Sequence, residues 1–141
     1  MIRSILIVDD SGVSRKVVQL CLEYSGLKGR EFIHAANGAL ALDILAKRSV
    51  DLLVTDLSMP VMDGPALIAA AARLPGAAAM AIIVATSLAS GSWEVELARK
   101  GVRAVVRKPL NNDSFTAAVA RIESAGSLTV MLDGAKLYKM A

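Results

Sequence analysis

The sequence predicts an α/β fold in which helices cover both faces of one parallel sheet. Short apolar runs of strand length alternate five times with segments of helical spacing, the pattern of parallel strands joined by helical crossovers. The run Ile5-Leu6-Ile7-Val8 is almost continuously apolar, as is typical of a strand buried on both faces. Polar side chains follow several of these runs, and the carboxyl edge of such a sheet is where ligands bind.

Size and composition predict a single domain with an aliphatic core. The chain has 141 residues, of which 55% are hydrophobic and only 4% are aromatic. The net charge is +3, and the 16 basic residues are scattered rather than clustered, so no nucleic-acid partner is indicated. We find no secretion signal and no apolar run of membrane-spanning length, which predicts a cytoplasmic protein without membrane insertion.

The elements can be assigned in chain order. The expected strands are Ile5–Val8, Glu31–Ala35, Leu52–Val54, Ala81–Ala85 and Ala104–Val106. The helices that follow them are expected to begin at Ser11, Asn37-Gly38, Asp63, about Ser90, and Asn112 or Asp113. In the first helix, apolar side chains recur at helical spacing at Val13, Val17, Leu20, Cys21 and Tyr24. We expect the single cysteine, Cys21, in the core.

The pattern changes beyond about Ala125, which predicts a domain over residues 1–125 and a C-terminal extension over 126–141. The segment Ser127-Leu-Thr-Val-Met-Leu132 lies between two glycines and is apolar. It is suited either to adding a strand at the sheet edge or to burying a homodimer interface. Residues 136–141 are expected to be helical or frayed.

The stretch from Asp51 to Gly64 is central to the predicted site. Asp56 comes directly after the apolar run, and Pro60 excludes a longer central strand because it has no amide to donate. Asp63 is expected to cap the next helix. Taken alone, Asp56 is equally well explained as a loop residue that caps a neighbouring element.

Four of the five strands end in polar groups that can act together. Asp9 and Asp10 follow the first strand, Asp56 the third, Thr86 the fourth and Lys108 the fifth. Because the strands are parallel, these ends converge on one edge of the sheet. Three carboxylates there need a compensating cation, and Mg²⁺ suits oxygen ligands. A phosphoryl group on Asp56 then becomes feasible, its charge offset by the metal and Lys108.

Together these motifs resemble the receiver domain of response regulators, the phosphoacceptor module of bacterial two-component signalling. The similar segments are Ile5-Leu-Ile-Val-Asp9-Asp10-Ser11, Asp51-Leu-Leu-Val-Thr-Asp56-Leu-Ser-Met-Pro60-Val-Met-Asp63-Gly64, Ile82-Ile-Val-Ala-Thr86-Ser87 and Lys108-Pro109. The resemblance extends from about Ile2 to Ser124 and is greatest to chemotaxis-type single-domain members. It implies a doubly wound, flavodoxin-like sheet with strand order 2-1-3-4-5, to which the short C-terminal extension predicted above is added.

The resemblance also implies a role for each site residue. Asp56 is the expected phosphoacceptor, Thr86 the switch hydroxyl and Lys108 the partner of the phosphoryl group. The implied cofactor is Mg²⁺, held by Asp10, Asp56 and the backbone carbonyl of Ser58, with Asp9 holding a water of the metal.

The implied function is that of a single-domain response regulator. It accepts a phosphoryl group on Asp56 from a sensor histidine kinase or phosphotransfer protein and changes its affinity for a downstream protein. It is an enzyme only in assisting its own phosphorylation and dephosphorylation. One departure is Val105, three residues before Lys108, where the family usually has an aromatic residue.

Three alternatives remain to be compared. Val105 leaves open an interaction module of the same fold that works without phosphorylation. A phosphohydrolase of the haloacid-dehalogenase type needs a second aspartate two residues after the first, where this chain has Ser58. A DNA-binding regulator is disfavoured because few residues follow the predicted domain.

Two features near the fourth helix have both a plain and a specific interpretation. Trp93 is expected to be a partly buried packing residue, with an anchor for a partner protein as the alternative. The basic residues around this helix and the fifth strand are expected to form a solvated face, with an acidic partner peptide as the alternative; they are Arg99, Lys100, Arg103 and Arg107.

Overall fold

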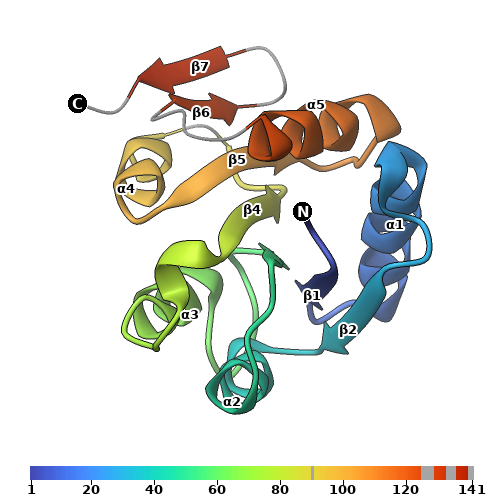
Figure 1. The fold of residues 1–141 in the computed structure, drawn as a ribbon. Helices are drawn as coiled ribbons and strands as arrows, with labels where there is room; N and C mark the ends of the chain where they lie inside the picture. The colour runs from blue at the N-terminus through green and yellow to red at the C-terminus, as the bar shows by residue number, and fades with distance from the viewer. Residues whose placement is uncertain (90, 125–128, 133–135, 140–141) are drawn as a thin grey trace.

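One twisted sheet runs through the molecule and confirms the predicted strand order. The structure, a computed structural model, describes residues 1–89, 91–124, 129–132 and 136–139. The strands lie in the order β2-β1-β3-β4-β5-β6-β7 (Figure 1). Their bounds are β1 Ser4–Val8, β2 Glu31–Ala35, β3 Leu52–Thr55, β4 Ala81–Thr86, β5 Val102–Arg107, β6 Thr129–Leu132 and β7 Lys136–Lys139. All neighbours pair in parallel except β6 and β7, which are antiparallel.

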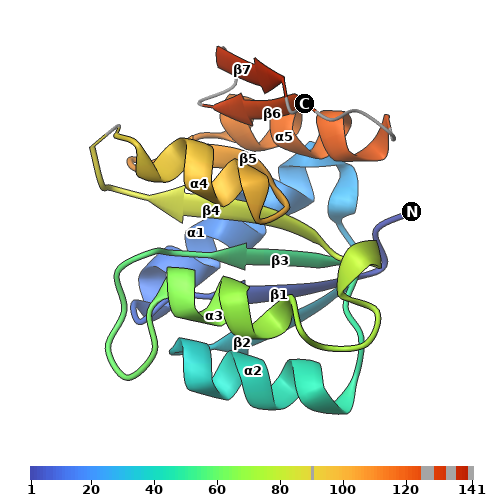
Figure 2. The same ribbon diagram turned by 90° about the vertical axis from the view of Figure 1, so that its left-hand side faces the viewer.

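Helices cover both faces of the sheet, as predicted. Figure 2 shows α2, α3 and α4 in front of the strands and α1 and α5 behind them. Their bounds are α1 Gly12–Leu22, α2 Gly38–Lys47, α3 Gly64–Ala71, α4 Trp93–Arg99 and α5 Asn112–Glu123, with a π-helical turn at Glu23–Leu27 and a 3₁₀ turn at Ala77–Ala79. Among the described helices, none is long and apolar enough to cross a bilayer.

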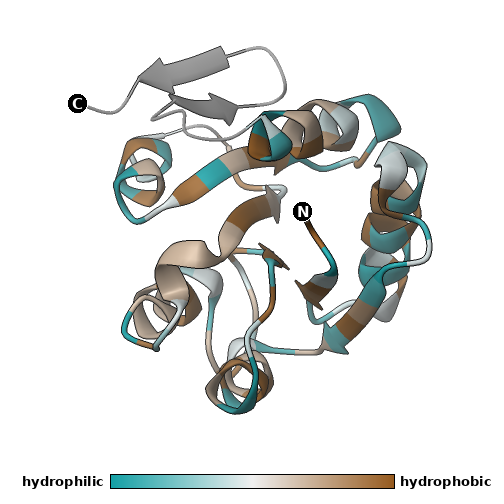
Figure 3. Cartoon of the chain, in the orientation of Figure 1, coloured by the Kyte–Doolittle hydropathy of each residue, from teal (hydrophilic) through white to brown (hydrophobic). Residues whose placement is uncertain are grey.

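The core is divided into two layers by the alternation of side chains along each strand. In β1, Ile5 and Ile7 pack toward α1 and α5, whereas Leu6 and Val8 pack toward α2, α3 and α4. The central strands are therefore hydrophobic on both sides, and Figure 3 shows this as brown strands between two-toned helices. This double burial is why the strands appear in the sequence as continuous apolar runs.

The apolar spacing of α1 does not mark one buried face. Val18, Cys21 and Leu22 are buried, as predicted for Cys21, but Leu20 and Tyr24 are exposed. Val13, at the start of the helix, is also exposed. Apolar residues therefore occur on two sides of α1 and of the π-helical turn that follows it: one side enters the core, with Val17 partly buried against it, and the other is exposed.

The helix starts follow the predicted capping rules with two corrections. Ser11, Asn37 and Asp63 are N-caps, as predicted. The cap of α5 is Asn111, not Asn112 or Asp113, because Asn111 has the extended backbone that a cap requires and its Oδ1 accepts from Ser114 N at 2.9 Å. Helix α4 begins at Trp93 rather than near residue 90 and has no side-chain cap.

The C-terminal segment continues the sheet beyond β5. Strand β6 pairs in parallel with β5, with Ala104 opposite Met131 and Val105 opposite Leu132. Residues Lys136–Lys139 form strand β7, so the expectation of a helical or frayed end is wrong for them; residues 140 and 141 lie outside the described part. Strand β6 satisfies amide and carbonyl groups that the edge of β5 would leave open, and β7 in turn pairs with β6. The boundary near residue 125 stays a prediction.

Candidate functional site

Three charged residues from three strand ends meet at the carboxyl edge of the sheet. Asp9 follows β1, Asp56 follows β3 and Lys108 follows β5. The Lys108 Nζ atom lies 2.8 Å from Asp9 Oδ2 and 2.9 Å from Asp56 Oδ2. Both carboxylates are almost fully buried, with 3% of Asp9 and 7% of Asp56 exposed. Two buried carboxylates therefore share one ammonium group, which compensates much of their charge.

The backbone orients Asp56. Its Oδ1 accepts from the amides of Leu57 at 2.6 Å and Ser58 at 3.3 Å. Its own amide donates to the Val8 carbonyl at 3.1 Å, which continues the pairing of β1 with β3 past the strand end. One carboxylate oxygen is thus held by the loop, and the other is directed at Lys108.

Two glycines allow the loop after Asp56 to fold closely against its neighbours. A Cβ atom on Gly64 would lie 2.2 Å from the carbonyl oxygen of Asp56, and a Cβ on Gly38 would lie 2.6 Å from that of Met62. Gly64 N donates to the Leu57 carbonyl at 3.0 Å, and Gly38 N donates to the Met62 carbonyl at 3.1 Å. Neither approach leaves room for a side chain, so Gly64 is needed beside Asp56 and Gly38 beside the end of the loop at Met62. Both glycines stand directly after a capping residue in the sequence, but no local pattern indicates these contacts.

Lys108 is held in its charged form. Burial lowers the pKa of its ammonium group, but hydrogen bonds to Asp9 and Asp56, together with their negative charges, outweigh that effect. The net result is a pKa above the ordinary value for lysine. At neutral pH the site therefore contains one fixed positive charge between two carboxylates.

Thr86 lies at the same edge, but its hydroxyl contacts its own loop. The residue is fully buried, and its Oγ1 accepts from Leu88 N at 3.2 Å. The Thr86 carbonyl accepts from Lys108 N at 2.9 Å, so the ends of β4 and β5 are tied together beside the carboxylates. Among the residues that the structure describes, no acceptor lies within hydrogen-bond reach of the Thr86 hydroxyl proton.

The predicted metal ligands are not equally placed. Asp9 and Asp56 converge on Lys108, whereas Asp10 and Ser58 are exposed. Within the described ranges, no group of three or more His, Cys, Asp and Glu side chains lies close enough to hold a metal ion. The donor chemistry nevertheless fits Mg²⁺, which takes one or two carboxylates and keeps its remaining positions for water and backbone oxygens. The full ligand set stays a prediction.

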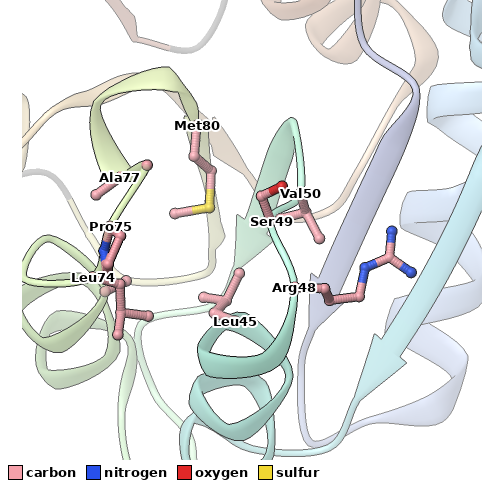
Figure 4. A pocket seen from close by; sticks show the side chains of 10 residues that line it. Leu45, Arg48, Ser49, Val50, Leu74, Pro75, Ala77 and Met80 are labelled. Carbon is pink, nitrogen blue, oxygen red and sulfur yellow. The ribbon is translucent and has the colours of Figure 1, made fainter.

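A small apolar pocket lies at the opposite, amino edge of the sheet. Figure 4 shows it between the end of α2 and the residues that lead into β4. Its lining includes Leu45, Val50, Leu74, Pro75 and Met80. Arg48 lies at the rim of this pocket, and its Nη2 is 2.7 Å from Glu31 Oε1. An apolar lining offers nothing for phosphoryl chemistry, so the carboxyl edge is the candidate site.

The comparison with known proteins identifies the family. Residues 5–120 match the response regulator receiver domain. The chain belongs to this family. As a receiver domain it is 27% identical over 121 residues to the probable chemotaxis protein CheY of Rhizobium etli, covering 86% of this chain and 92% of that protein.

Larger proteins contain similar receiver domains. The autoinducer 1 sensor kinase/phosphatase LuxN of Vibrio campbellii is 34% identical over 106 residues, which are 75% of this chain but 12% of that protein. A protein-glutamate methylesterase/protein-glutamine glutaminase of Rhodospirillum centenum is 30% identical over 81% of this chain and 29% of its own length. The chain thus spans less than a third of these two relatives.

The fold is also that of solved receiver domains. The chemotaxis response regulator CheY4 of Vibrio cholerae superposes with a TM-score of 0.75 and 27% identity, covering 86% of this chain and 99% of that one. This agreement confirms the flavodoxin-like receiver fold predicted for the first five strands.

One group of side chains beside the site was not predicted. Arg107, expected on a solvated face, instead pairs with the buried carboxylate of Glu94 and lies over the ring of Trp93, 5.3 Å from its centroid. The expectation of a solvated arginine is therefore wrong. Strand position alone gives no signal for this contact, because the arginine and the glutamate come from different elements.

Proposed function

We propose that this receiver domain accepts a phosphoryl group on Asp56 from a sensor histidine kinase or phosphotransfer protein and thereby changes its affinity for a downstream protein. The main support is the position of Lys108, whose ammonium group is bonded to the carboxylates of both Asp9 and Asp56. A buried nucleophilic carboxylate beside a fixed cation is the arrangement that phosphoryl transfer to an aspartate needs.

The chemistry follows from the two oxygens of Asp56. The Leu57 and Ser58 amides hold Oδ1, which leaves Oδ2 directed at Lys108 as the attacking atom. Its bond to phosphorus forms as the phosphorus–nitrogen bond of the donor phosphohistidine breaks, and the imidazole leaves with its electron pair and takes up a proton. Lys108 offsets the negative charge that the phosphoryl group adds.

A divalent metal is part of the proposal. Asp9, Asp10, Asp56 and the Ser58 carbonyl would hold Mg²⁺, with Asp9 acting through a water. Bound there, the ion would supply positive charge opposite the phosphoryl oxygens, which two carboxylates alone would repel. Thr86 would donate its hydroxyl proton to one of those oxygens.

Intact mass after incubation with a small-molecule phosphodonor tests the proposal. We expect a Mg²⁺-dependent gain of one phosphoryl group that is absent in Asp56→Asn. Asp43→Asn is the matched control, because Asp43 is an exposed carboxylate on α2. A wild-type chain that gains no mass with Mg²⁺ would contradict the proposal.

The alternative is an interaction module that works without phosphorylation. The feature that favours it is Val105, which is buried in the core and offers no aromatic ring for a switch. If the mass stays constant in every condition, this alternative becomes the preferred function.

A further inference from the structure

The side chain of Arg107 joins two segments that lie apart in sequence. Its Nη1 donates to the Leu88 carbonyl, and its Nη2 donates to Glu94 Oε1. Its guanidinium also stacks on Trp93. One planar group at the end of β5 therefore contacts both the loop after β4 and the first turn of α4.

The buried carboxylate of Glu94 explains why Arg107 pairs with the start of α4. Only 4% of Glu94 is exposed, although it lies in the first turn of a surface helix. A buried carboxylate is costly unless a cation meets it, and Arg107 supplies that cation. Trp93 adds a second tie, because its Nε1 donates to the Ala89 carbonyl at 2.9 Å. The start of α4 is thus fastened to the loop that leads into it.

The same loop is connected to the candidate site. Leu88 N donates to Thr86 Oγ1, and the Leu88 carbonyl accepts from Arg107. Leu88 is therefore held by Thr86 through its amide and by Arg107 of β5 through its carbonyl, and Arg107 in turn contacts Glu94 of α4. A Thr86 hydroxyl that rotates toward a phosphoryl oxygen would leave the Leu88 amide without its acceptor.

Strand β5, which ends at Arg107, contains no aromatic side chain that could link the site to α4. The β5 sequence is Val102-Arg-Ala-Val-Val-Arg107. Val105 is 1% exposed and packs in the core layer that contains α3 and α4. Val105 has no aromatic ring for a coupling role, whereas Arg107 contacts both the loop after Thr86 and the first turn of α4.

We propose that Arg107 is a positioning residue that couples the Thr86 hydroxyl to the start of α4. Without a phosphoryl group it holds Leu88 and Glu94 together. On phosphorylation Thr86 releases the Leu88 amide, Leu88 shifts, and Arg107 loses the Leu88 carbonyl while it keeps Glu94. The surroundings of Trp93 then change. This inference rests on the proposed phosphorylation of Asp56.

Tryptophan fluorescence of the full chain tests this coupling, because Trp93 is its single tryptophan. Emission is recorded before and after incubation with the phosphodonor and Mg²⁺, and the intact mass of the same sample gives the phosphorylated fraction. We expect the wild-type chain to change its emission in proportion to that fraction, and Asp56→Asn to show neither change.

Two substitutions separate coupling from structural support. Arg107→Ala removes every contact, whereas Arg107→Lys keeps a cation for Glu94 but loses the fork that reaches Leu88 at the same time. We expect both to be phosphorylated as fully as wild type and to lose the phosphorylation-dependent change in emission. Arg107→Lys should keep a melting temperature near wild type. Lys100→Ala, which removes an exposed cation at the end of α4, should keep the full change.

The outcomes are distinct. A wild-type chain that gains the phosphoryl mass without a change in emission overturns the coupling and leaves the proposed function intact. A full emission change in phosphorylated Arg107→Lys also overturns it, because a cation for Glu94 would then be sufficient. A wild-type chain that gains no mass overturns the proposed function, and the coupling with it.

Discussion

Lys108 Nζ lies 2.9 Å from Asp56 Oδ2, although the two residues are 52 positions apart in the sequence. The contact spans β4, which lies between β3 and β5 in the sheet. It follows from the parallel register, because strands that run in one direction deliver their last residues to the same edge. The candidate site is thus a consequence of sheet topology rather than of local sequence.

Replacing Lys108 tests its role as the shared counter-ion. Lys108→Met leaves two buried carboxylates without a cation, so we expect the free energy of unfolding at pH 7 to fall by about 2 kcal/mol, a value reduced by the partial exposure of the lysine. The pKa of Lys108 is raised above the ordinary lysine value of 10.5, so its contribution is fully present at pH 7.

Mg²⁺ should recover part of this loss, because it takes the place of the missing charge. Urea unfolding with and without Mg²⁺ measures both effects, with Lys100→Met as the exposed control. Equal stability of Lys108→Met and wild type without Mg²⁺ would contradict the counter-ion role.

Substitution of Gly64 tests the close approach at Asp56. A methyl group in Gly64→Ala would lie 2.2 Å from the Asp56 carbonyl oxygen, so the loop must move. We expect a loss of about 2 kcal/mol in stability and slower phosphorylation, because Asp56 shifts relative to Lys108. Gly12→Ala is the control, since its Cβ would meet only Arg15 Nη2 at 3.5 Å. If both variants behave alike in urea unfolding and in phosphorylation, the close packing of Gly64 against the Asp56 carbonyl does not require a glycine.

The hydrogen bonds to the Asp51 carboxylate predict that part of the free energy of unfolding is lost in acid. Its Oδ2 accepts from Arg3 N at 2.9 Å and Ser4 N at 3.1 Å, and these hydrogen bonds, that of Arg3 first, lower the pKa of its carboxyl group. A lowered pKa stabilises the fold above the unfolded value of 3.8, and this contribution is lost as the pH falls through the folded pKa. Asp51→Ala should cost about 1 kcal/mol at pH 7.

Urea unfolding between pH 7 and pH 2 measures the Asp51 contribution. The difference between wild type and Asp51→Ala should shrink below pH 3.8, in the range where the carboxylate becomes protonated. Asp43→Ala, which removes an exposed carboxylate, is the control. A difference that stays constant over the whole range would refute the assignment.

Deletion of residues 127–141 tests the role of the extension. We expect Asp56 to remain phosphorylated, because the site lies within β1 to β5. The deletion removes the backbone partner of Ala104 and Val105, so an open β5 edge should associate with a second copy and raise the mass in solution. A fall from dimer to monomer would support the dimer predicted through the extension instead. Unchanged mass and unchanged partner affinity would exclude both roles.

The sequence by itself determined the alternation of strands and helices, the strand ends that bear Asp9, Asp56 and Lys108, and most of the helix caps. These signals are local: an apolar run, a capping side chain or a proline acts within a few residues of itself. The resemblance to receiver domains added the strand order and the expected role of each site residue.

Only the tertiary structure decided which of these residues touch. The sharing of Lys108 by two carboxylates depends on the sheet register, and the exposed apolar stripe of α1 depends on which side of the helix meets the sheet. The pairing of Arg107 with Glu94 reverses the expected solvated arginine, because α4 places a carboxylate where water cannot reach it. Such contacts depend on packing between distant segments, and no local pattern of residue types records them.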